Sequence, residues 1–391
     1  MLRYDGYHYL PLLQYVEKLF PKGHLDDVYL LACQHILPST HMMLRSMVNL
    51  GLKKDRVALI GKCYSTNKIT MENMRQEGFY VCESSSKFKP ESSFDEQFRS
   101  NIYNFVHSQF QRMQPNKNAR IIFLDDGGEM LSIAQDLSRT YSNFFGVEQT
   151  SSGYHKLAYN SINFPIKNVA LSNEKLNFES PFIAVSVLKC LEQRIALSTL
   201  LPKQILIVGN GYIGKEVCTL LKGNQYNHHK VIGYDVVHDK SELDYVDFSQ
   251  FDIILGATGN RMMTHNYYDS LKNNAVLASV SSSDREFDAV HFRRLSGVVN
   301  NVHDDVFYNG FCLLNSGFPL NFNGDDRVSV PLGKIQLVCA LLVLAVCEYK
   351  ESNQQQKQFV RLDKELTEKI VGKFNIIDRR IGYEKFIEKH D

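Results

Sequence analysis

The sequence predicts an α/β protein of two domains, each built on a parallel sheet that helices cover. Short apolar runs such as residues 57–60 (VALI) alternate with segments of helical spacing such as residues 39–50. The alternation resumes after residue 200, and repeated strand–helix units are typical of parallel α/β sheets. The chain has 391 residues, a length that fits two or three domains with large cores.

The charge balance, the cysteines and the apolar runs exclude several classes of protein. Lys plus Arg is 44 and Asp plus Glu is 43, giving a net charge of +1 that argues against a nucleic-acid partner. The eight cysteines form no CxxC pair, so we expect buried reduced thiols and no metal site. The longest apolar run, residues 335–347, is too short to cross a membrane. The opening residues MLRYDGYHYL show no secretory signal, so we expect a cytoplasmic protein.

In the first half of the chain, apolar runs predict strands at residues 57–60 and 121–124. Residues 28–31 fit either a short strand or a helix end, and residues 39–50 have helical spacing. The polar segment 83–93 (ESSSKFKPESS) predicts an exposed loop.

The second half opens with a predicted helix over residues 181–200, because Pro181 favours the first turn of a helix. The elements expected after it are a strand at 205–208, a helix at 212–221, strands at 231–234, 253–255 and 275–280, and a closing helix at 331–349. We place one domain at residues 1–184 plus 320–391 and the other at residues 185–319.

A glycine loop between a strand and a helix is the sharpest local pattern. The segment QILIVGNGYIGKEV places Gly209, Gly211 and Gly214 in GxGxxG spacing. The first glycine permits a tight turn, the second lets the backbone approach a pyrophosphate, and the third lets the helix pack on the strand. The next strand ends in Asp235, whose carboxylate suits ribose hydroxyls and repels a 2′-phosphate. The loop therefore predicts a Rossmann domain that binds NAD.

Alternatives remain at this loop and at the following strand end. The glycine loop also fits a doubly wound domain that binds no cofactor or a different adenine nucleotide. The segment ATGN places Thr258, Gly259 and Asn260 where ligands of open α/β sheets bind. It fits equally well a plain strand–helix turn that Asn260 caps.

Several segments in order resemble the S-adenosyl-L-homocysteine hydrolase (adenosylhomocysteinase) family. They are residues 33–51 (CQHILPSTHMMLRSMVNLG), 63–68 (CYSTNK), 123–130 (FLDDGGEM), 146–153 (GVEQTSSG), 165–180 (PIKNVALSNEKLNFES) and 313–317 (LLNSG), together with the glycine loop and ATGN. Their order is preserved from about residue 30 to residue 350. We therefore expect a divergent member of that family.

The resemblance implies that bound NAD transiently oxidises an alcohol of an S-adenosylhomocysteine-like nucleoside. It implies catalytic positions at His35, Asp126, Gln149, Lys175 and Glu179. The cofactor contacts implied by the resemblance and the glycine loop are Thr150, Ser151, Gly209, Gly211, Tyr212, Ile213, Gly214, Asp235, Thr258, Gly259, Asn260 and Asn315. Simpler roles also fit: a turn acid at Asp126, a surface lysine at Lys175 and a buried, hydrogen-bonded His35.

Five positions depart from the family pattern. Gln149 replaces a glutamate, Glu179 an aspartate and Ser180 an asparagine, while Ser282 and Phe322 replace histidines. Loss of one general acid or base typically costs about two orders of magnitude in rate or more. We therefore expect altered catalysis, and the alternative is a catalytically silent protein that binds NAD or an adenine metabolite.

The end of the chain bears on oligomeric state. The resemblance implies a homo-oligomer whose chain end reaches a neighbouring subunit's cofactor site. The terminal segment IGYEKFIEKHD does not match that tail.

Overall fold

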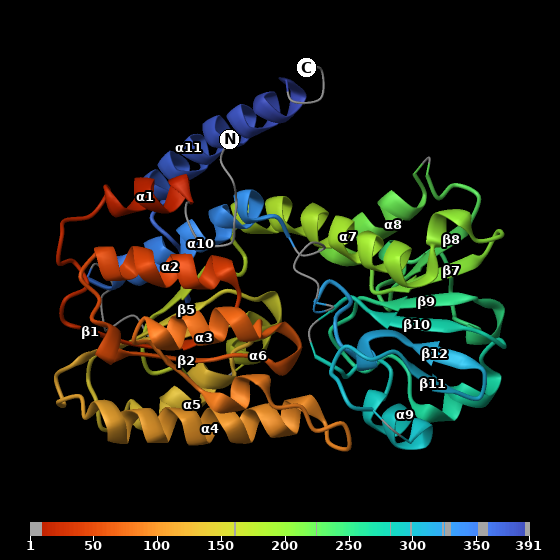
Figure 1. Cartoon of the computed structure of the whole chain (residues 1–391), viewed down its shortest axis with the longest axis horizontal. Helices are drawn as coiled ribbons and strands as arrows, with labels where there is room; N and C mark the ends of the chain where they lie inside the picture. Colours follow the sequence, from red (N-terminus) through yellow and green to blue (C-terminus); the bar gives the residue numbers. More distant parts are fainter. Residues whose placement is uncertain are drawn as a thin grey trace.

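The computed structural model describes residues 10–159, 162–223, 225–281, 283–297, 299–322, 324, 330–350 and 359–387. They form two α/β bodies that lie side by side (Figure 1). The long helix α7 (Asn173–Ile195) runs from one body to the other. The predicted α/β class is therefore confirmed.

The first body contains a seven-stranded parallel sheet in the order β13–β6–β5–β4–β1–β2–β3. Its strands are β1 (Val28–Cys33), β2 (Val57–Ile60), β3 (Tyr80–Val81), β4 (Arg120–Asp125), β5 (Phe144–Glu148), β6 (Ile166–Asn168) and β13 (Phe359–Val360). The ambiguous segment 28–31 is thus part of a central strand.

Helices cover both faces of this first sheet. One core holds α1 (Pro11–Glu17), α2 (Pro38–Asn49), α3 (Lys68–Gln76), α10 (Leu332–Cys347) and α11 (Lys364–Ile387). The other core holds α4 (Phe94–Met113), α5 (Glu129–Leu137) and α6 (Ser151–Ala158). The chain returns to this body after the second sheet, through α10, β13 and α11. The apolar helix predicted over residues 331–349 is the buried α10.

The second body contains a six-stranded sheet in the order β11–β12–β10–β9–β7–β8, parallel except for the pair β11–β12. Its strands are β7 (Gln204–Val208), β8 (Lys230–Tyr234), β9 (Ile253–Gly256), β10 (Val276–Ser279), β11 (Val306–Tyr308) and β12 (Phe311–Leu313). Helices α7 and α8 (Tyr212–Leu221) cover one face, and α9 (Ala289–Ser296) covers the other.

The start of α7 corrects the sequence prediction. The helix begins at Asn173 instead of Pro181, because the Ser172 side chain caps it by accepting a hydrogen bond from the Lys175 N–H at 3.3 Å. Pro181 lies inside the helix, where it removes one backbone donor. The helix continues past this proline because residues from Ala184 onward pack in the core with α8.

Segment 83–93 also differs from the exposed loop that was predicted. It begins with a 3-10 turn (Glu83–Ser86) in which Ser85 is buried. Phe88 packs against cores in both bodies, and the carbonyls of Pro90 and Ser92 accept hydrogen bonds from Arg293. The segment therefore connects the two bodies. The sequence prediction failed because a polar composition does not show that a distant arginine binds the backbone carbonyls of the segment.

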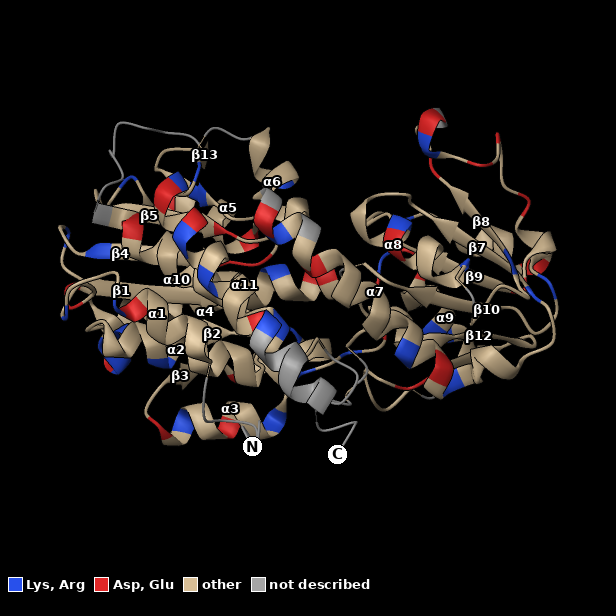
Figure 2. Ribbon diagram, turned by 90° about the horizontal axis from the view of Figure 1, so that it is seen from above, with Lys and Arg blue, Asp and Glu red and all other residues tan. Residues whose placement is uncertain are grey.

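Each sheet changes its winding direction at one point, and such points are where open α/β sheets bind ligands. In the first sheet the point lies between β1 and β4, and in the second it lies between β7 and β9. Acidic and basic residues are interspersed along the ribbons of both bodies (Figure 2). Among the described residues, no helix is long and apolar enough to cross a membrane.

Candidate functional site

Four neighbouring strand ends meet at Asp126. This residue directly follows β4, Gln149 directly follows β5, and His35 and Lys62 lie two residues beyond β1 and β2. Asp126 accepts hydrogen bonds from Lys62 Nζ and Gln149 Nε2, while His35 Nε2 lies 3.2 Å from Asp126 Oδ2. The structure therefore brings together three predicted residues and adds Lys62, which the sequence analysis missed.

The charges in this cluster are set by the pair of Lys62 and Asp126. Burial by itself would raise the pKa of Asp126, but Lys62 and His35 outweigh it and hold that pKa well below its usual range. Burial opposes the charge on Lys62, yet the nearby Asp126 raises the pKa of this lysine above its usual range. Asp126 is thus an ionised hydrogen-bond acceptor at neutral pH.

The ring of His35 is fixed on several sides. Its Nδ1 lies 2.5 Å from Ser65 Oγ. Phe322 stacks on the ring with a centroid separation of 4.5 Å and an interplanar angle of 28°, and Tyr64 meets it edge-on. Phe322, at a position where the resemblance predicted a histidine, therefore covers the imidazole.

Lys175 and Glu179 form a separate pair in the first turns of α7. Lys175 Nζ lies 2.6 Å from Glu179 Oε2, so among the described side chains this glutamate is the ion-pair partner of the lysine. Burial, together with the charge of Glu179, raises the pKa of Cys339 in α10 to about 12. The pair thus faces α10 and does not join the ion pair of Asp126. Ser180 donates to the Leu176 carbonyl, and Ser282 lies outside the described residues.

Two buried carboxyl groups directly precede residues of the cluster, at the ends of β4 and β5. Asp125 and Glu148 are register neighbours on β4 and β5, and both are fully buried. Asp125 Oδ2 accepts from the Leu131 N–H at 2.9 Å, and Glu148 Oε1 accepts from the N–H and hydroxyl of Thr150 at 2.8 and 2.7 Å. Burial raises the pKa of Asp125 to about 6 and raises the pKa of Glu148 well above its usual range.

The first prediction concerns the pH dependence of stability. Because the pKa of Asp125 is about 6 in the folded chain and 3.8 is its reference value, the unfolded chain loses this proton first as pH rises. Between about pH 4 and about pH 6 this group therefore lowers the free energy of unfolding as pH increases. Asp125→Asn keeps an oxygen for the Leu131 N–H and removes the titration. Urea unfolding across this range should show a smaller decline for the variant, and an unchanged decline would contradict the assignment.

Two of the predicted cofactor positions lie next to these acids. The Thr150 hydroxyl donates to Glu148 and accepts from the Gly153 N–H at 3.0 Å, so it caps α6. Ser151 is the first residue of that helix. Both residues therefore organise the turn after β5, and cofactor contact stays a prediction for them.

The glycine loop lies at the switch point of the second sheet. A side-chain carbon at Gly209, whose φ is +99°, would lie 2.6 Å from the backbone of Ala257, and one at Gly214 would lie 1.9 Å from the Gly209 carbonyl oxygen. Tight backbone packing therefore requires both glycines. Gly211 differs, because its φ is −74° and a side-chain carbon (Cβ) there would meet no atom within 4 Å. The fold does not need glycine at this position, so the open space suits the close approach of a ligand.

The other predicted cofactor residues of this region lie at the start of α8 and directly after β8. Tyr212 and Ile213 open α8, and the Tyr212 side chain is 57% exposed. Asp235 follows β8, and its two oxygens accept from the N–H groups of Asn210 and Val237 at 2.7 and 2.9 Å. The carboxylate thus holds the loop against the end of β8, where it retains acceptor capacity.

Glu286 is a second residue that the sequence analysis missed. It is fully buried, and its Oε1 accepts from the N–H groups of Thr258 and Gly259 at 2.6 and 2.9 Å. The Thr258 hydroxyl donates to the Asn260 carbonyl at 2.9 Å. Glu286 therefore fixes the ATGN turn. A side-chain carbon at Gly256 would lie 2.2 Å from Glu286 Oε2, so glycine is required there. This contact depends on the tertiary structure, and no local sequence pattern predicts it.

Asn315 is buried, and its side-chain amide forms hydrogen bonds to other residues of the chain. Its Nδ2 donates to the carbonyls of Pro319 and Phe322, both at 3.0 Å, and its Oδ1 lies 3.0 Å from His303 Nδ1. Its φ of 53° is in the left-handed region, which asparagine tolerates better than most residues. Asn315 thus shapes the segment that carries Phe322.

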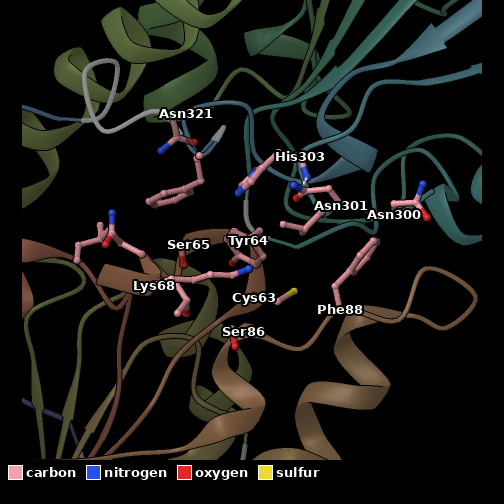
Figure 3. A pocket seen from close by; sticks show the side chains of 16 residues that line it. Cys63, Tyr64, Ser65, Lys68, Ser86, Phe88, Asn300, Asn301, His303 and Asn321 are labelled. Atoms are coloured by element: carbon pink, nitrogen blue, oxygen red, sulfur yellow. Dashed lines mark hydrogen bonds between the residues drawn. The ribbon is translucent and has the colours of Figure 1, made fainter. Parts of the chain in front are cut away.

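A cavity of about 490 Å³ lies between the two bodies, beside His35. Tyr64, Ser65 and Lys68 line it from the first body, and Asn301 and His303 line it from the second (Figure 3). Phe322, which stacks on His35, also lines the cavity, so the cavity adjoins the cluster around Asp126.

The fold and the strand-end clusters define a two-body α/β protein with a Rossmann-type second body. The chain belongs to the family of two uncharacterized proteins of Mycobacterium tuberculosis, MT0113 and Rv0104. Each is 36% identical to it over 349 residues, which cover 87% of this chain and 68% of the mycobacterial protein. No family model matches the chain.

Two solved structures resemble the chain distantly. An NAD⁺-bound 3-phosphoglycerate dehydrogenase from Entamoeba histolytica gives a TM-score of 0.38 at 10% identity, covering 85% of this chain and 100% of that one. An NAD-dependent formate dehydrogenase from Staphylococcus aureus gives 0.39 at 13% identity, covering 78% and 98%. Similarity at this level adds nothing to the assignment of a function.

Proposed function

We propose that the protein is an NAD-dependent enzyme similar to adenosylhomocysteinase, acting on an S-adenosylhomocysteine-like nucleoside by transient oxidation of an alcohol. The observation that carries this proposal is the glycine loop, where packing requires Gly209 and Gly214 but leaves Gly211 facing open space. A glycine that the fold does not need is best explained by a ligand that needs it.

The residues around this space fit NAD. The backbone of the Gly209–Gly214 turn and the N-terminus of α8 suit the pyrophosphate, while Asp235 suits the adenosine ribose. The Thr258–Asn260 turn, held by Glu286, forms the other wall. When bound, NAD supplies a hydride acceptor for a secondary alcohol.

For the substrate, the chain offers two pairs of ionisable side chains. His35, hydrogen-bonded to an ionised Asp126, can hold and release a proton near the cavity. Lys175 and Glu179 form a largely buried ion pair near the start of α7, and this pair suits a polar group of a substrate. Gln149 and Phe322, which depart from the adenosylhomocysteinase pattern, both contact the His35–Asp126 pair. These contacts support a reaction that differs in detail from that of adenosylhomocysteinases.

The test starts with the purified full chain. Mass spectrometry of the released ligand should find NAD, and adding S-adenosylhomocysteine or adenosine should produce the absorbance of the reduced nicotinamide. Bound NAD with no such absorbance for any nucleoside would exclude the enzyme and leave the silent binding protein. Absence of NAD binding at any concentration would exclude the enzyme and leave only a silent protein that binds another adenine metabolite.

One observation favours the silent alternative. Phe322 covers the His35 ring. Lys62, Gln149 and His35 all bind the Asp126 carboxylate, which leaves it little capacity to accept a hydrogen bond from a substrate. A binding protein would show ligand-dependent stabilisation without turnover, about 2.7 kcal/mol at a free ligand concentration of 100 times the dissociation constant.

A further inference from the structure

Ser65, His35 and Asp126 form a chain of hydrogen bonds that ends at the interdomain cavity. Ser65 Oγ lies 2.5 Å from His35 Nδ1, and His35 Nε2 lies 3.2 Å from Asp126 Oδ2. A hydroxyl on a base that a buried acid orients is the geometry of an activated serine. We infer that Ser65 is a nucleophile for acyl transfer, an activity beyond the proposed NAD-dependent reaction.

With a neutral imidazole, the donors and acceptors in this chain fit an arrangement in which the Ser65 hydroxyl donates to His35. Asp126 is ionised and can only accept, so the ring nitrogen that faces it, Nε2, carries the hydrogen. The neutral imidazole then has its lone pair on Nδ1, where it accepts the hydrogen of the Ser65 hydroxyl. His35 is therefore placed as a general base toward Ser65, with its two nitrogens exchanged relative to the best-known serine triads.

The base is held rigidly, as such catalysis requires. Phe322 stacks on the His35 ring and Tyr64 meets its edge, which restricts rotation of the imidazole. Lys62 and Gln149 hold Asp126 from two further directions. The stacked Phe322 acts here as a positioning residue for the base.

The reacting hydroxyl borders a space that can hold a small substrate. Ser65 lines the cavity of about 490 Å³, and Asn301 and Asn321 also line it (Figure 3). Amide donors there can stabilise charge that develops on a substrate oxygen. The neighbouring thiol is a poor competitor, because burial raises the pKa of Cys63 to about 12 and keeps it protonated.

The chemistry fits an ester or thioester. Ser65 Oγ bonds to the carbonyl carbon while His35 Nδ1 takes the hydroxyl proton. The bond from that carbon to the leaving oxygen or sulfur breaks, and the leaving group takes the proton from His35. Water then adds to the acyl-serine, with its proton passing to His35, and the acid is released as Ser65 regains its hydrogen.

The test uses diisopropyl fluorophosphate on the full chain without added NAD, followed by peptide mass spectrometry. Ser65 Oγ should bond to phosphorus with release of fluoride, and the proton should pass to His35. His35→Gln should slow this labelling by on the order of 100-fold, and Ser65→Ala should abolish it. Ser86→Ala is the matched control, since Ser86 lines the same cavity and should leave labelling at Ser65 unchanged.

Two outcomes would overturn the inference: no modification of Ser65, or modification at the same rate in His35→Gln. Circular dichroism of each variant separates these outcomes from misfolding. Because NAD is not added, labelling does not depend on the proposed oxidation, so either proposal can fail while the other stands.

Discussion

Replacing Arg293 with alanine is expected to lower the free energy of unfolding by about 3–5 kcal/mol. Arg293 in α9 is only 2% exposed, and its guanidinium lies 2.7 Å from the carboxylate of Asp284. It also donates to the carbonyls of Pro90 and Ser316, both at 2.8 Å. The alanine variant would leave the buried Asp284 carboxylate without its cationic partner and would leave the Pro90 and Ser316 carbonyls without the arginine donor. It would also remove a polar link between segment 83–93 and the second body.

The adjacent arginine provides a matched control. Arg294 is exposed and donates to the Glu91 carbonyl at 2.5 Å, so Arg294→Ala should cost less than about 1 kcal/mol. Urea unfolding of the two variants beside the unmodified chain measures the difference. Equal losses for both arginines would mean that the buried pair contributes no more than a surface contact.

Replacing Gly211 with valine is expected to weaken NAD binding at least about tenfold, which corresponds to about 1.4 kcal/mol. The prediction rests on the proposed function. A Cβ at this position meets no protein atom within 4 Å, and the backbone has a negative φ that valine adopts. Gly211 is also the N-cap of α8, where valine is less favourable, so the variant should lose at most about 1 kcal/mol of stability. The added methyl groups should occupy the space through which the pyrophosphate must approach the backbone.

Isothermal titration with NAD, paired with thermal unfolding, separates these two effects. Gly372→Val in α11 is the control, since Gly372 also faces open space but lies in the other body. It should change neither NAD affinity nor, by more than about 0.5 kcal/mol, stability. Unaltered affinity in Gly211→Val would show that the glycine loop binds no pyrophosphate.

Elements with a strong local pattern were predicted closely. The helix after the glycine loop was expected at residues 212–221, and α8 spans Tyr212–Leu221. Its signals are all local: a buried strand, a glycine turn and apolar spacing. The start of α7 was wrong because two local signals competed, and the cap at Ser172 together with burial of the later turns outweighed the proline.

The sequence by itself determined the α/β class, the glycine loop and the residues at several strand ends, because each depends on spacing within about 20 residues. Only the tertiary structure decided which strand ends become neighbours. The order β2–β1–β4–β5 brings Lys62, His35, Asp126 and Gln149 together, and it gives Asp126 the lysine that holds it ionised. It also places Ser65 on His35 and Phe322 over the ring. These contacts join residues up to 287 positions apart (322 − 35), and they follow from how sheets and helices pack, which no local pattern contains.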